Sequence, residues 1–167
     1  MKRFRKLLCV VSAEERHRPT LERAVSLAAS SGATLTVAVV CPPLPPGLGL
    51  PSGSAEAAAL ERAVAAEMRD DLEAFVAGHM ESTPIAIRVL SGIPFLAVIR
   101  AILADGYDLL IKRAESPTFT QRIFGSDDMH LLRKCPCPVW LTRPDEKPHY
   151  RSIVAAVDAG GGAPEEE

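Results

Sequence analysis

Short apolar runs alternate along the chain with segments of helical periodicity. Leu7 to Val11 is a continuous apolar run that ends in the small polar residue Ser12, a pattern typical of a strand buried on both faces. The segment that follows is predicted to be a helix that stops at Gly32, since apolar residues recur there at helical spacing: Leu21, Ala24, Val25, Leu27 and Ala28. A second β-rich run covers residues 33–40, so the chain opens with a β-α-β pattern.

The same alternation continues to residue 142. A Pro/Gly-rich loop over 42–54 precedes a long predicted helix, whose apolar stripe we expect to face the core: Leu60, Val64, Met68, Leu72, Phe75 and Val76. Three further strands are predicted over 84–90, 108–111 and 139–142, with helices around 95–102 and 126–134. This order predicts an α/β fold in which a doubly wound five-stranded parallel sheet carries helices on both faces. Such sheets bind ligands at the carboxyl ends of strands, near the switch point in strand order.

The composition favours one globular domain followed by a fragment of a second. We assign residues 1–143 to the first domain, 144–150 to a Pro-containing linker, and 151–167 to the first strand and loop of a second copy. The reason is that Ser152 to Asp158 resembles the chain's own first strand, an apolar run that ends in a small polar residue. We therefore expect the native protein to continue beyond residue 167.

The charge balance and the cysteines narrow the function classes. A formal charge of -2 and a pI near 6.1 do not favour nucleic acid as a partner, and the first apolar run is too short for a signal peptide or a membrane span. The cysteines lie in or beside predicted strands, which favours a reducing cytoplasm: Cys9, Cys41, Cys135 and Cys137. Cys135-Pro136-Cys137 has no His pair nearby, so buried thiols are favoured over a zinc site.

Four motifs in this order resemble the universal stress protein family. They are Gly92-Ile93-Pro94 before a helix, Asp108 to Ile111 as a strand, Gly125-Ser126 before a helix, and Cys135 to Val139 leading into the last strand. The resemblance covers about residues 5–142 and implies an adenine nucleotide alpha hydrolase-like fold with strand order 3-2-1-4-5. The run Met129 to Pro136 and the Lys that ends strand four are similar to the first domain of tandem members. The implied partner is a second universal stress domain or a homodimer, joined through a sheet edge.

The same resemblance implies where a nucleotide would bind. ATP-binding members carry an Asp at the end of strand one, and after strand four a Gly-x-x-Gly, nine residues, and Gly followed by Ser or Thr. In this sequence Ser12 stands at the Asp position and Lys112 and Glu115 stand at the first two glycines, while Gly125 and Ser126 are kept. Glycines let backbone N–H groups approach phosphate, and the helix N-terminus adds unpaired donors. We therefore expect an eroded nucleotide site.

The substituted residues disfavour a triphosphate. Glu115 adds negative charge where bare backbone would approach phosphate, and Asp127 and Asp128 satisfy the helix dipole themselves. Lys112 offsets part of this charge but does not replace a backbone cradle. Ser126 is predicted to be a helix N-cap rather than a phosphate ligand.

No catalytic constellation is predicted, because His130 has no nucleophile or carboxylate placed with it. Three function classes stay open. The first is a non-catalytic stress-response binding and assembly module without a cofactor, which the sequence favours. The second is an ATP-binding regulatory protein with slow or no hydrolysis. The third is a small-ligand carrier that uses the Pro-rich loop and the long helix as a lid.

Overall fold

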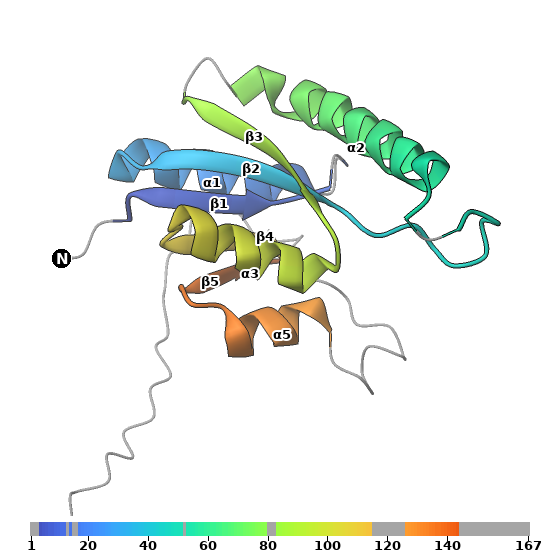
Figure 1. The fold of residues 1–167 in the computed structure, drawn as a ribbon. Helices are drawn as coiled ribbons and strands as arrows, with labels where there is room; N and C mark the ends of the chain where they lie inside the picture. The colour runs from blue at the N-terminus through green and yellow to red at the C-terminus, as the bar shows by residue number, and fades with distance from the viewer. Residues whose placement is uncertain are drawn as a thin grey trace, which may run out of the picture.

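The structure, a computed structural model, describes residues 4–12, 14, 17–51, 53–79, 83–114 and 126–143. Its centre is a five-stranded sheet in the order β3-β2-β1-β4-β5, in which every neighbouring pair is parallel (Figure 1). The strands are β1 (Lys6–Val10), β2 (Thr34–Cys41), β3 (Ile85–Ser91), β4 (Leu109–Arg113) and β5 (Val139–Thr142). The predicted fold class and strand order are both confirmed.

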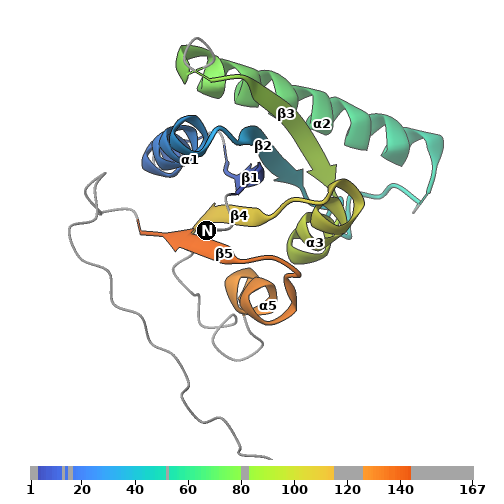
Figure 2. The same cartoon turned by 90° about the vertical axis from the view of Figure 1, so that its left-hand side faces the viewer.

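Helices cover both faces of this sheet. The helices α1 (Arg18–Ser31) and α2 (Ala55–Val76, followed by a 3-10 turn at Ala77–His79) lie on one face, and α3 (Pro94–Asp105) and α5 (Asp127–Lys134) lie on the other (Figure 2). Because successive strand residues point to opposite faces, Leu7 and Cys9 pack under α1, whereas Leu8 packs under α3. Burial on both sides is the reason that β1 is apolar at every position from Leu7 to Val10.

The helix ends follow their local signals. α1 carries a proline in its first turn and stops at Gly32, whose φ of 66° lets its N–H donate to the Ala28 carbonyl. α3 begins at Pro94 and stops in the same way at Gly106, where φ is 69°. These two left-handed positions turn the chain sharply from a helix into the next strand.

The expected core-facing stripe of α2 is only partly right. Leu72 is fully buried, and Phe75 and Val76 lie in the same core cluster, but Leu60 is 38% exposed. A 22-residue helix is about 33 Å long, whereas the seven-residue strand β3 beside it spans about 23 Å. The sheet therefore ends before the helix does, and the first half of α2 projects beyond it (Figure 2).

The cysteines divide into two pairs. Cys9 and Cys41 are buried, as predicted, and burial raises the pKa of the Cys9 thiol to about 12. Cys135 and Cys137 are only partly buried, so the expectation of buried thiols is wrong for them. They lie in the short connection between α5 and β5, whose residues are partly or fully exposed.

Some predictions fall outside the described residues. The linker at 144–150 and the second-copy strand at 151–167 are among them, as are Glu115 and Gly125 of the proposed nucleotide site. Within the residues that the structure does describe, no helix is long and apolar enough to cross a membrane.

Candidate functional site

The strand order places a switch point between β1 and β4. From β1 the chain winds outward through β2 to β3, and it then crosses to β4 and β5 on the opposite side. Ligands of doubly wound sheets bind beyond the carboxyl ends of the strands at such a point. Val10 at the end of β1 is in register with Lys112 near the end of β4, so the predicted site residues Ser12 and Lys112 lie at the same edge of the sheet.

Ser12 is held in a tight turn after β1. Its hydroxyl donates to a Glu14 carboxylate oxygen at 3.0 Å, and its backbone N–H faces Nδ1 of His17 at 3.4 Å. The Ser12 carbonyl accepts from the Glu14 N–H at 2.8 Å. The polar groups of Ser12 are therefore satisfied by its own turn, which places a carboxylate beside the switch point.

Lys112 forms an ion pair with the first turn of α5. Its Nζ lies 2.7 Å from an Asp128 carboxylate oxygen, and the two side chains are only 12% and 10% exposed. At such low exposure the attraction is screened much less than on a surface, and each charge needs the other as compensation for lost hydration. A carboxylate of the chain itself thus occupies the helix N-terminus where a phosphate would be stabilised.

Ser126 caps the same helix. Its Oγ accepts from the Met129 N–H at 3.3 Å and its carbonyl accepts from the His130 N–H at 3.1 Å. This is the capping role predicted for Ser126, and the residue is almost completely buried. Ser126 thus caps the helix turn whose Asp128 pairs with Lys112 of β4.

If Ser126 acts only as a cap, Ser126→Ala should destabilise the protein by about 1 kcal/mol, the usual cost of losing an N-cap side chain. Ser54 is a matched control, because it caps α2 in the same way, with its Oγ accepting from the Ala57 N–H at 3.1 Å. Urea unfolding of Ser126→Ala and Ser54→Ala should give similar losses. A loss at Ser126 several times that at Ser54 would show that its hydroxyl has a further role.

A pair of buried threonines lies between α1 and the end of β5. The Oγ1 atoms of Thr20 and Thr142 are 2.6 Å apart and both residues are buried. The Thr142 hydroxyl also lies 3.4 Å from the Lys112 carbonyl, to which it donates. No local sequence pattern marks this contact, because it joins residues 122 positions apart. The ends of β4 and β5 are thus tied to α1 by polar groups of the protein.

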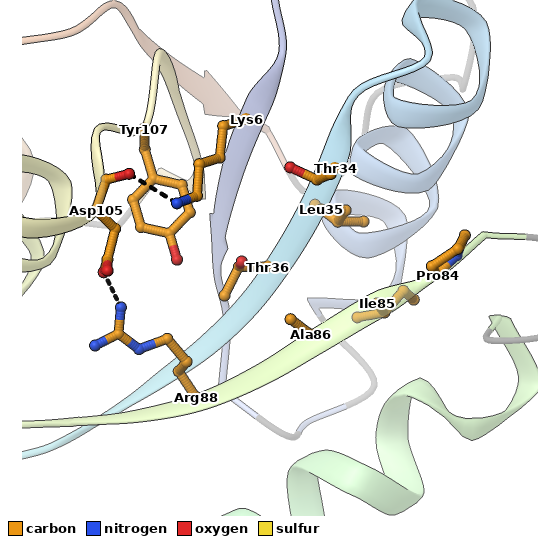
Figure 3. Close-up of a pocket in the computed structure, with 10 residues that line it drawn as sticks. All are labelled: Lys6, Thr34, Leu35, Thr36, Pro84, Ile85, Ala86, Arg88, Asp105 and Tyr107. Carbon is orange, nitrogen blue, oxygen red and sulfur yellow. Dashed lines mark hydrogen bonds and ion pairs between the residues drawn. The ribbon is translucent and has the colours of Figure 1, made fainter.

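An open hollow of about 780 Å³ lies at the opposite edge of the sheet, by the amino ends of β1, β2 and β3 (Figure 3). The Arg88 guanidinium pairs with the Asp105 carboxylate, and Lys6 Nζ donates to the Asp105 carbonyl at 2.7 Å. Lys6 Nζ also lies 5.0 Å from the centre of the Tyr107 ring, and the hydrogen bonds that Arg88 makes to Tyr107 and Asp105 raise the pKa of Arg88. These charged groups satisfy one another, and the hollow is far from the switch point.

A smaller hollow of about 410 Å³ lies between the Pro-rich loop and the start of α2. Apolar side chains dominate its lining, among them Leu44, Leu48 and Leu50. Glu61 is the only ionisable side chain among the described residues that line it. This is the place where the carrier hypothesis expects a ligand, and it offers an apolar surface with little to orient a polar molecule.

Comparison with known proteins agrees with this fold. The model of the universal stress protein family matches residues 3–143. Universal stress protein E of Photorhabdus laumondii subsp. laumondii is 27% identical over 161 residues, which are 95% of this chain and 51% of that protein. This chain therefore spans about half the length of that relative.

Solved structures show the same fold at lower identity. Universal stress protein UspA from Lactobacillus plantarum superposes with a TM-score of 0.69 at 21% identity, over 86% of this chain and 100% of that one. A universal stress protein in complex with cAMP gives a TM-score of 0.60 at 20% identity, over 86% and 99%. With the family model matched from residue 3 to residue 143, this chain belongs to the universal stress protein family.

Proposed function

We propose that this chain is a non-catalytic binding and assembly module whose nucleotide site is closed by its own side chains. The observation that carries the proposal is the ion pair between Lys112 and Asp128 at the N-terminus of α5. The relative solved with cAMP supports the view that this fold can hold a nucleotide. In this chain the groups at the switch point already bind one another.

A phosphate at the N-terminus of α5 would have to approach the Asp128 carboxylate. Two like charges about 4 Å apart repel by about 1 kcal/mol in water and by several kcal/mol in a partly desolvated site. Turning Lys112 toward the phosphate does not remove the problem, because it takes the ammonium away from a carboxylate that is only 10% exposed. Both arrangements disfavour a bound triphosphate.

Calorimetric titration with Mg-ATP and with cAMP tests this proposal. We expect no measurable binding by the chain, whereas Asp128→Asn should bind at least about tenfold more tightly, because one repulsive charge worth more than 1.4 kcal/mol is removed. Asp127→Asn, which removes a neighbouring charge in the same turn, shows whether the effect is specific to Asp128. Tight binding by the unchanged chain would contradict the proposal and favour the ATP-binding regulatory function.

Assembly is the second part of the proposal. β5 is an edge strand of the sheet, so its outer backbone groups can pair with another strand. The relative from Photorhabdus is about twice as long as this chain, which supports the first domain of a tandem protein as the role of these residues. The proposed partner is the second universal stress domain, or a second copy of this chain when that domain is absent. Sedimentation of the isolated chain as a monomer at all concentrations would exclude the second copy.

The carrier function is the alternative that one observation favours, namely the apolar hollow beneath the Pro-rich loop. A carrier should retain its ligand through purification. Mass spectrometry of the denatured protein would detect a lipid or another apolar metabolite, and a Leu48→Asp variant should lose it. The absence of any such molecule, together with an unchanged affinity for apolar dyes in Leu48→Asp, would count against this function.

A further inference from the structure

Two thiols meet in the connection between α5 and β5. Cys135 ends α5 and Cys137 follows one proline later, with their Sγ atoms 3.6 Å apart and both cysteines free. The connection is anchored on both sides, because the Cys135 N–H donates to the Leu131 carbonyl at 2.9 Å and the Leu110 N–H donates to the Pro138 carbonyl at 3.0 Å. The proline between the cysteines also fixes its own φ. The backbone on both sides of the two cysteines is therefore fixed, and their side chains meet above it.

Cys135 and Cys137 differ from the other two cysteines in their solvent exposure and in their contact with each other. Cys9 and Cys41 are buried in the sheet, whereas Cys135 and Cys137 are both partly exposed. No third His, Cys, Asp or Glu completes a metal-binding group with them in the part of the chain that the structure describes. A disulfide requires the sulfurs to approach to about 2.05 Å, a shift of roughly 1.5 Å from their separation of 3.6 Å. The geometry thus suits bond formation between the two sulfurs better than metal binding.

We propose that Cys135 and Cys137 are an oxidation site at which a hydroperoxide produces a reversible disulfide within the chain. The Cys135 thiolate attacks one peroxide oxygen, the O–O bond breaks, and Cys135 becomes a sulfenic acid while hydroxide leaves and takes up a proton. The Cys137 sulfur then attacks the Cys135 sulfur, the S–O bond breaks, and a second water leaves with the Cys137 proton. Two thiols thereby lose two electrons and two hydrogen atoms, and one hydrogen peroxide is reduced to two waters.

The surroundings of Cys137 favour its thiol form. Burial and a hydrogen bond with Cys135 raise the pKa of Cys137 to about 12, which suits Cys137 to the second step. Once Cys135 carries a sulfenic acid, Cys137 is the thiol already in contact with it. Tethered groups have effective concentrations in the millimolar range. At a micromolar protein concentration, disulfide formation within one chain should therefore be faster than crosslinking between chains by on the order of a thousandfold.

The test uses the full chain, reduced and then treated with hydrogen peroxide. Trypsin cuts after Lys134 but not before Pro144 or Pro148, so one peptide runs from Cys135 to Arg151 and holds neither Cys9 nor Cys41. We expect this peptide to be lighter by two hydrogen atoms in most molecules, and dithiothreitol to restore its mass. Circular dichroism before digestion confirms that the protein is folded.

Two variants separate this disulfide from general oxidation. Cys137→Ser should not yield the peptide that is lighter by two hydrogen atoms. Its Cys135 should instead be captured as a sulfenic acid by dimedone. Cys41→Ala leaves the pair intact and should behave like the unchanged chain. The proposal is overturned if the unchanged chain keeps both thiols under conditions that oxidise Cys135 in Cys137→Ser, or if its disulfides join Cys135 or Cys137 of different chains.

Discussion

Replacing Lys112 with methionine is expected to destabilise the protein by about 3 kcal/mol at neutral pH. The variant leaves the Asp128 carboxylate, only 10% exposed, without the ammonium 2.7 Å away. Removing one partner of a buried ion pair costs about 3–5 kcal/mol, and the small remaining exposure of both groups puts this pair at the lower end. Urea unfolding should show a lower midpoint with an unchanged slope.

Two control variants show whether the lost stability comes from the ion pair between Lys112 and Asp128. Arg69→Met removes an ion pair of similar length, 3.0 Å to Glu73, whose side chains are about half exposed, and it should cost less than about 0.5 kcal/mol. Adding Asp128→Leu to Lys112→Met removes the stranded charge and should recover most of the loss. If Lys112→Met costs no more than Arg69→Met, the ion pair does not hold the switch point closed.

Much of the fold could be predicted because the local signals agree with the final packing. β1 and β2 are buried on both faces over Leu7–Val10 and Val37–Val39, so the sequence is apolar without interruption in these two stretches. Gly32 adopts the left-handed conformation that ends α1. The α2 stripe was only partly right for a physical reason. Periodicity gives the direction in which Leu60 and Leu72 point, but it does not say where the sheet beneath them ends.

The site could be predicted only as a set of positions. Alignment to the family motif brought out Ser12, Lys112 and Ser126, and the parallel sheet carries the first two to the same edge. From the sequence alone, Asp128 is interpreted as a charge that satisfies the helix dipole, whereas in the structure it forms an ion pair with Lys112. The contact of Thr20 with Thr142 depends on packing between α1 and β5, and no motif of neighbouring residues records it.

Replacing Leu72 with alanine is expected to destabilise the protein by about 3 kcal/mol. Leu72 is fully buried in the cluster that joins α2 to β2 and β3, together with Phe75 and Val76. Truncation of a buried leucine costs about 2–5 kcal/mol, since the lost transfer free energy adds to the cost of the cavity. Urea unfolding with tryptophan fluorescence measures the change, because Trp140 packs against the same cluster.

Leu60→Ala is the matched control on the same helix. Leu60 is 38% exposed, so its truncation should cost less than about 1 kcal/mol in the isolated chain. A loss as large as that of Leu72→Ala would mean that the projecting half of α2 is covered in solution. Coverage by a second copy would make the Leu60 loss grow with protein concentration, since association stabilises the folded state by mass action. The Leu72 loss would not change in this way, because that side chain is buried within one chain.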